Sequence, residues 1–226
     1  MNLEKEHQRH REMWDRVLSK RSESPPKFRF QSDFYVRYGN KIMEPILDIG
    51  CGNGEFLEFL LLENRIDVYG IDISDMAVDL TRNRLRPILG DEVKSRVVRG
   101  DMISLSDHYP AGYFRTMICE GTLHQTTFTG AILIAKQIHT VASDHALIYV
   151  SVRSDKTLPN GAVPVENERE TYRLEEEEGV VRCYFSKEGI VSVFKDLFSI
   201  LEIEERELLT RIGSKPYSMW ILVLRK

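Results

Sequence analysis

The 226-residue sequence has few cysteines, no long apolar run and little net charge. Its three cysteines, Cys51, Cys119 and Cys183, form no C-x-x-C pair, and an odd number cannot all pair within one chain. No segment approaches the roughly 18 consecutive apolar residues of a membrane span, and no secretion signal follows the first residues. We therefore expect a cytoplasmic protein outside the membrane, whose cysteines are small buried residues rather than reactive thiols.

The charge balance also excludes bulk attraction to polyanions. The net charge is −4 at pH 7, which gives no general pull toward nucleic acid or anionic lipid, and a nucleic-acid acceptor is disfavoured. Hydrophobic residues make up 42% and charged residues 29%, as in ordinary globular proteins. A chain of this length is expected to bury one sizeable core.

The most informative feature is a glycine-rich turn between two apolar runs. Gly50, Gly52 and Gly54 follow the run Pro45–Ile49, and a second run ends on Asp72. Glycine allows backbone to approach a ligand closely, and an acid at the end of the second strand is placed to bind ribose hydroxyls. No lysine follows the glycines, and Asp48 precedes them, so a phosphate is a poor ligand and an ammonium group a good one. A nucleoside with a cationic amino-acid end, such as S-adenosylmethionine, fits this pattern.

At this point the sequence resembles the class I S-adenosylmethionine-dependent methyltransferases over roughly residues 30–226. The resemblance rests on four ordered segments, 48–54, 69–74, 97–102 and 114–124. It implies S-adenosylmethionine as cofactor and S-adenosylhomocysteine as product, and it is nearest to the small-molecule and tellurite-resistance-like subgroups. The cofactor residues that it implies are Asp48, Gly50, Cys51, Gly52, Gly54, Asp72, Ile73, Asp101, Met102, Glu120 and Gly121. Asp101 and Met102 would flank the adenine, and the backbone carbonyl of Glu120 would face the cofactor ammonium.

The rest of the chain alternates between predicted strands and helices. Strands are expected at 45–50, 67–73, 96–100, 114–119, 145–152, about 198–204 and 218–225, and helices at 54–64, 75–86, 128–142 and 187–197. This alternation predicts an α/β, doubly wound fold with a mostly parallel sheet. A turn around Gly213 and Pro216 predicts a final hairpin. In the resembled family the seventh strand is reversed in this way.

Two segments lie outside this alternation. Residues 1–29 are predicted to form an N-terminal helical extension or lid, with a helix over about 2–20 and a break at 22–26. Residues 153–186 contain a predicted β-hairpin with a glutamate-rich tip, which would hang over the carboxyl edge of the sheet as part of the substrate wall. A solvated surface excursion is the alternative for this insertion, and the main domain spans 30–226.

Several residues near the N-terminus have two interpretations. Trp14 and Tyr35 are candidates to close the pocket, Trp14 on the cofactor and Tyr35 on the substrate, although packing explains Trp14 equally well. Arg37 is a candidate partner for the cofactor carboxylate or an ordinary surface arginine. His7 and His10 have the spacing of metal ligands but no further partners nearby, so we expect surface histidines and no metal site.

Methyl transfer from a sulfonium needs mainly the positioning of a nucleophile. His124 is the candidate general base and a candidate substrate contact, with a structural hydrogen bond as the alternative. The 119–122 loop lacks the Asn/Asp-Pro-Pro-aromatic motif, and no Pro-Cys pair or paired-glutamate loop occurs, which favours a small-molecule acceptor over nucleic acid or arginine side chains. Two other functions stay open, a nicotinamide oxidoreductase and a non-catalytic S-adenosylmethionine-binding module. The oligomeric state is not predicted.

Overall fold

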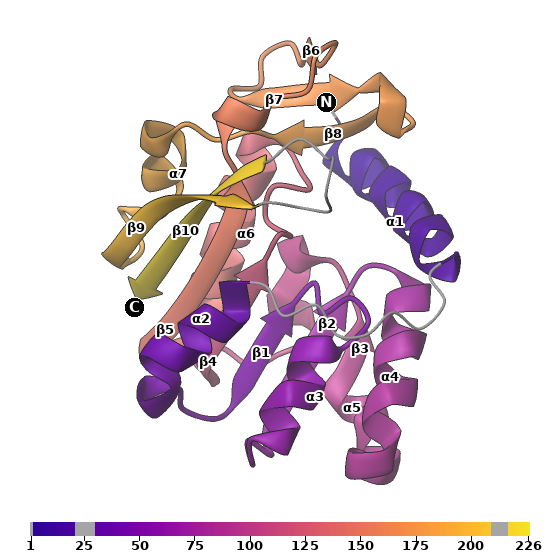
Figure 1. The fold of residues 1–226 in the computed structure, drawn as a ribbon, viewed down its shortest axis with the longest axis vertical. Coiled ribbons are helices and arrows are strands. Elements are labelled where there is room, and N and C mark those ends of the chain that lie inside the picture. Colours follow the sequence, from indigo (N-terminus) through magenta and orange to yellow (C-terminus); the bar gives the residue numbers. More distant parts are fainter. Residues whose placement is uncertain (1, 21–29, 209–216) are drawn as a thin grey trace.

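The computed structural model describes residues 2–20, 30–208 and 217–226 (Figure 1). A seven-stranded sheet in the order β3-β2-β1-β4-β5-β10-β9 forms its centre. Its strands are β1 (Ile46–Ile49), β2 (Val68–Asp72), β3 (Val97–Arg99), β4 (Phe114–Glu120), β5 (Ala142–Arg153), β9 (Ser199–Leu208) and β10 (Tyr217–Arg225).

The sheet is parallel except for its last strand. β10 pairs antiparallel with both β5 and β9, while the pairs among β3, β2, β1, β4 and β5 are all parallel. The predicted fold class, with a reversed last strand, is confirmed. Because parallel strands end at the same edge, the residues that follow β1, β2, β3 and β4 meet there.

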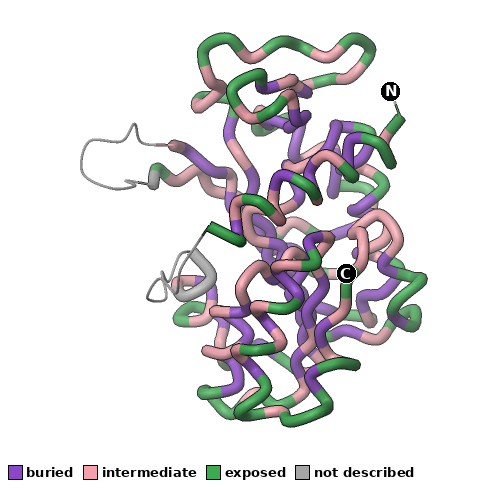
Figure 2. The backbone as a smooth tube through the Cα atoms, turned by 90° about the vertical axis from the view of Figure 1, so that its right-hand side faces the viewer, coloured by how far each residue is buried: buried purple, intermediate pink, exposed green. Residues whose placement is uncertain are grey.

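Helices cover both faces of the sheet. Helices α3 (Glu55–Leu62) and α4 (Asp75–Leu89), with α2 (Phe30–Tyr38), bury their apolar side chains against one face. Helices α6 (Phe128–Val141) and α7 (Lys187–Phe194) cover the other. All four residues of β1 are buried, as expected for a central strand covered on both sides. Figure 2 shows buried backbone running through the middle of the molecule.

The structure differs from the predicted elements in a few places. Helix α2 was not predicted. Within residues 33–38, for which burial is described, only Phe34 and Tyr38 are buried against the core, and one such pair gives no periodic pattern. Helix α4 extends through its Pro87 to Leu89, and β5 begins at Ala142. The predicted break at 22–26 and the turn at Gly213 and Pro216 lie outside the described residues.

The N-terminal helix and the insertion lie together over the carboxyl edge of the sheet. The insertion contains the predicted hairpin, β7 (Thr171–Leu174) and β8 (Val180–Cys183), and a further strand, β6 (Val163–Pro164), that pairs with β7. Helix α1 (Leu3–Ser19) spans from this small sheet to α4 (Figure 1). The edge where the predicted cofactor residues meet is therefore covered by two segments that are distant in sequence.

Candidate active site

The glycine turn after β1 has the geometry of a loop that a ligand can approach. Gly50 has φ +76° and a Cβ added to it would lie 2.2 Å from the Thr122 hydroxyl, so the turns after β1 and β4 pack too closely for a side chain. Gly52 also has positive φ, +57°, but a Cβ there would meet nothing within 4 Å. The loop is thus tightly packed on one side and open on the other.

Asp72 holds the glycine loop and the start of α4 in place. Its Oδ2 accepts a hydrogen bond from the Gly52 amide at 2.9 Å, and its Oδ1 accepts one from the Ser74 amide at 2.9 Å. Burial raises the pKa of this carboxyl, while the backbone donors lower it. Each carboxylate oxygen keeps a second lone pair, so Asp72 can accept two further hydrogen bonds from a diol.

Asp48 is a buried acid without a compensating partner in the described part of the chain. It lies in β1 with 3% of its surface exposed, and no hydrogen bond or ion pair to its carboxylate occurs among those residues. Burial, and then repulsion from Asp72, raise the pKa of Asp48 to about 7. An unpaired buried carboxylate is costly. A cationic group seated above the glycine loop would compensate for that cost.

Asp101, after β3, is bound to helix α1. Its Oδ1 accepts from the Ile103 amide at 3.1 Å, and its Oδ2 lies 2.5 Å from His7 Nδ1. The other ring nitrogen of His7 lies 2.7 Å from the Thr126 hydroxyl. A pocket of about 270 Å³ at this point is lined by Ile73, Gly100 and Asp101 on one side and by residues of α1 on the other.

The expectation that His7 and His10 lie on the surface is wrong. They are only 3% and 2% exposed, and His10 Nε2 lies 2.7 Å from the Val181 carbonyl oxygen. Both histidines lie on the buried face of α1, where their imidazole rings form hydrogen bonds with polar groups of other segments. Burial lowers the pKa of His10 to about 4. No group of histidine, cysteine and acidic residues within the described ranges has a metal-binding arrangement.

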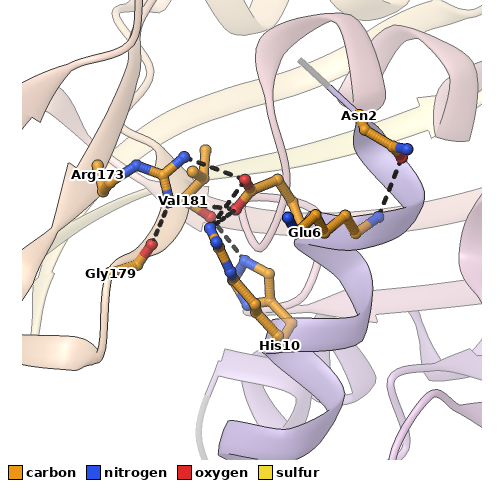
Figure 3. Close-up of polar contacts among 8 residues, drawn as sticks. Asn2, Glu6, His10, Arg173, Gly179 and Val181 are labelled. Atoms are coloured by element: carbon orange, nitrogen blue, oxygen red, sulfur yellow. Dashed lines mark hydrogen bonds and ion pairs between the residues drawn. The ribbon is translucent and has the colours of Figure 1, made fainter.

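Helix α1 is anchored at both ends of the cleft. At the small sheet, Glu6 Oε1 lies 3.1 Å from Arg173 Nη2, next to the His10–Val181 contact (Figure 3). Burial acts to raise the pKa of Glu6, but Arg173 and Arg9 outweigh it and lower the pKa. At the other end, Asp15 Oδ1 accepts from the Ser74 hydroxyl at 2.6 Å.

His124 lies in the loop after β4, under the small sheet. It is 3% exposed, its carbonyl accepts from the Cys183 amide at 3.0 Å, and its Nδ1 has no hydrogen-bond partner among the residues that the structure describes. Burial, followed by the positive charges of Arg153 and Arg182, lowers the pKa of His124 well below its usual value. The imidazole is therefore neutral at pH 7 and a weak base.

The remaining predicted cofactor residues form backbone hydrogen bonds or pack against the core. Gly121 donates its amide to Ser151, and the Glu120 carbonyl accepts from the Thr122 hydroxyl at 3.0 Å. Met102 begins the short helical segment Met102–Asp107 and packs beside the core. Cys51 is buried, and burial raises the pKa of its thiol, as it does for Cys119 and Cys183.

Two predicted site residues are not brought to this edge. The Tyr35 hydroxyl donates to Glu63 at the far end of α3, which begins at the glycine loop, so Tyr35 lies toward the opposite edge of the sheet. Arg37 is paired with Asp33, Glu202 and Glu204. Both predictions assumed that residues just before β1 reach the cleft, but α2 packs along the face of the sheet. Trp14 is half-buried on α1.

Three residues with clear roles at this edge were missed. Asp15 accepts from the first turn of α4, Thr122 packs against Gly50, and Arg153 ends β5 facing His124. The spacing of Asp15 on a helical stripe gave no signal, because its partner is 59 residues away. The position of Arg153 had the clearest signal in the sequence, because it is the one cation at the end of a mostly apolar run, 146–152.

Comparison with known proteins agrees with this geometry. Residues 46–144 match the family model described as a methyltransferase domain. No curated protein sequence is significantly similar to the chain. No helix in the described ranges is long and apolar enough to cross a membrane.

Solved structures share the fold over nearly the whole chain. An S-adenosylmethionine-dependent methyltransferase from Methanosarcina mazei has a TM-score of 0.68 and 23% identity, covering 85% of this chain and 97% of its own. Magnesium protoporphyrin IX methyltransferase from Synechocystis PCC 6803, solved with bound S-adenosylmethionine, has a TM-score of 0.58 and 19% identity, with coverages of 97% and 81%. The [4+2]-cyclase SpnF has a TM-score of 0.64 and 16% identity, with coverages of 97% and 96%.

These comparisons confirm the predicted fold. Residues 46–144 match a methyltransferase domain, and the fold is shared with S-adenosylmethionine-dependent methyltransferases. The likeness to a cyclase shows that this fold also occurs in a protein described by another reaction, so the acceptor and the chemistry have to be argued from the site.

Proposed function

We propose that this protein transfers a methyl group from S-adenosylmethionine to a small-molecule acceptor by in-line displacement. The observation that carries the proposal is the unpaired, buried Asp48 beside the open glycine loop and the doubly anchored Asp72. A ligand with an ammonium group and a ribose diol satisfies both acids at once. A dinucleotide would instead bring phosphates next to Asp48, where the like charges repel.

Each side of the cleft supports one part of this ligand. Asp72 would accept the two ribose hydroxyls, and Asp48 with the Glu120 carbonyl would face the ammonium group. Ile73, Asp101 and Met102 would flank the adenine, and Gly50, Cys51, Gly52, Gly54 and Gly121 would provide close backbone. When bound, the cofactor supplies an electrophilic methyl group on a sulfonium. The chain itself then has to hold the acceptor in line and keep water out.

We further propose that residues 1–29 form a lid over the cofactor and that the 153–186 insertion forms a wall of the acceptor site. The support is the set of contacts from α1 to α4, Asp101 and the small sheet. Removal of residues 1–28 is expected to weaken S-adenosylhomocysteine binding about tenfold. Isothermal titration of a folded truncated chain with unchanged affinity would contradict the lid.

The test of the main proposal is ligand discrimination followed by turnover. Titration with S-adenosylmethionine and S-adenosylhomocysteine should give micromolar affinity, and NADH should not bind. Preferential binding of NADH would favour the oxidoreductase instead. Formation of S-adenosylhomocysteine with a panel of small acceptors then separates a transferase from a non-catalytic binding module, which would bind the cofactor but never turn it over.

A further inference from the structure

Arg153, at the end of β5, is a cation without an ion pair among the residues that the structure describes. Its guanidinium lies 4.0 Å from the centre of the Tyr217 ring, and no acid of the described chain pairs with it. Burial is the main cause that lowers the pKa of Arg153. A guanidinium removed from water needs an anion to offset its lost hydration.

The backbone places four side chains on the same side as Arg153. Val152 lies in the core on one face of the sheet, so Arg153 is on the opposite face, together with Ser151 and the buried Tyr149. The Phe185 amide donates to the Arg153 carbonyl at 2.9 Å, which sets the end of β5 beside the residues after β8. Cys183 and Phe185 point into the core, and therefore Arg182 and Tyr184 point toward the Arg153 side.

The two arginines on this side differ in their partners. Arg182 is neutralised by Glu177, at 2.5 Å, and its Nε donates to Gln125 at 2.9 Å. His124 is neutral, and its buried Nδ1 has no partner in the described ranges. Glu120, level with Ser151, also lies on this side. Arg153 is therefore the arginine here that has no ion pair in the described chain, and His124 keeps one unsatisfied imidazole nitrogen.

Arg153 and Asp48 lie at different places on the carboxyl edge of the sheet. In the register of the sheet, Asp48 of β1 is opposite Ile118 of β4, and Glu120 of β4 is opposite Ser151 of β5. Arg153 is therefore two strands away from Asp48 and four residues nearer the carboxyl ends of the strands. At about 3.3 Å per residue and 4.8 Å per strand, the two Cα atoms are roughly 16 Å apart. The two charges therefore mark different parts of the edge, and binding of S-adenosylhomocysteine to an Arg153 variant tests whether they hold separate molecules.

We propose that Arg153 binds a carboxylate on the methyl acceptor, so that the acceptor is a small carboxylic acid. This inference rests on the function proposed above. The planar guanidinium matches a carboxylate through two parallel hydrogen bonds. His124 Nδ1 supplies a further polar contact, and Tyr184 and Tyr217 give the site aromatic walls that suit an aryl or other planar acid.

The experiment uses the full chain loaded with S-adenosylhomocysteine. Binding of benzoate and phenylacetate is compared by titration with binding of their neutral amides, in the wild type and in Arg153→Gln, Arg153→Lys and the exposed Arg86→Gln as matched control. We expect at least one acid to bind at least tenfold more tightly than its amide in the wild type and in Arg86→Gln. Arg153→Gln should lose this preference, and Arg153→Lys should keep part of it.

The outcomes separate this inference from the function on which it rests. Arg153→Gln should bind S-adenosylhomocysteine with wild-type affinity, which also shows that the variant is folded. Acids and amides that bind alike in the wild type, or a preference for acids that survives in Arg153→Gln, would overturn the role of Arg153. A wild type that does not bind S-adenosylhomocysteine would overturn the proposed function itself.

Discussion

The two halves of the cleft each hold one charge without an ion pair in the described chain, a buried acid in one half and a half-buried cation in the other. On the cofactor side, Asp48 is an acid among glycines and short strands. On the acceptor side, Arg153 is a cation among aromatic rings and a neutral histidine. A site that keeps two such charges apart is suited to two ligands, a cationic one and an anionic one, that meet between them.

The halves also differ in how their parts are connected. On the cofactor side the contacts are short in sequence, such as Asp72 with Ser74 and with Gly52, 2 and 20 residues away. The cover of the cleft depends on long-range contacts, His7 with Asp101 over 94 residues and Glu6 with Arg173 over 167. Substitutions should therefore separate cofactor binding from acceptor binding.

Replacing Asp72 with asparagine should have the largest effect on the cofactor side. The change removes the charge that two ribose hydroxyls would bond, and hydrogen bonds to charged groups contribute about 1.5–3 kcal/mol each. We expect S-adenosylhomocysteine affinity to fall about 100-fold or more by titration calorimetry. The exposed Asp79→Asn should bind as the wild type does. A loss below threefold in Asp72→Asn would show that the ribose lies elsewhere.

Gly52→Ala and Gly112→Ala form a matched pair. Both glycines have positive φ, +57° and +68°, and neither Cβ would meet an atom within 4 Å. Each substitution should lower the free energy of unfolding by about 1–2 kcal/mol, because a side chain is strained in this conformation. Only Gly52→Ala should also weaken cofactor binding, by more than tenfold, because only there does the methyl group occupy the ligand's space. Equal binding by both variants would place the ligand away from the loop.

Asp48 should make stability and cofactor affinity depend on pH in opposite ways. Its pKa is about 7 in the folded protein against an ordinary 3.8, so the folded state holds a proton that the unfolded state has lost. The free energy of unfolding without ligand should therefore fall as pH rises from about 4 to about 7, by up to about 4 kcal/mol, and then level off. A cationic ligand prefers the ionised acid, so affinity should weaken as pH falls below 7.

Asp48→Asn tests this pair of trends. The variant should unfold with little dependence on pH between 4 and 7, and it should bind S-adenosylhomocysteine about tenfold more weakly at pH 8. Chemical denaturation and calorimetry at several pH values measure the two effects. A pH profile of stability that the substitution leaves unchanged would mean that Asp48 is not the titrating group.

His124→Asn should have the smallest effect. A general base contributes about 10²–10⁴ to a rate, whereas a neutral, weakly basic imidazole that only contacts the acceptor contributes much less. We expect kcat to fall less than tenfold with an acceptor that supports turnover, and the pH profile of kcat to keep its shape. A drop above a hundredfold together with a lost pH limb would establish His124 as the catalytic base.

The strands, the helices that follow them and the glycine turn between two acids could be predicted because their signals are local. A glycine turn, an acid at a strand end and apolar runs act through neighbours in sequence, and the parallel sheet brings their ends to one edge. The surface placement of His7 and His10 was wrong, and Tyr35 and Arg37 lie away from the predicted edge, because their positions depend on partners outside their own helices. A helical stripe shows which face is covered, but not which polar groups will meet it.

The sequence by itself determined the order of strands and helices, the open glycine loop and the pair of acids next to it, because these follow from backbone freedom and periodic burial. Only the tertiary structure decided which polar groups hold α1 over the cleft, that α2 takes Tyr35 and Arg37 away from it, and that Arg153 lies close enough to His124 to lower its pKa. Those outcomes depend on which charges find partners when segments more than 90 residues apart pack together, and no local pattern encodes that pairing.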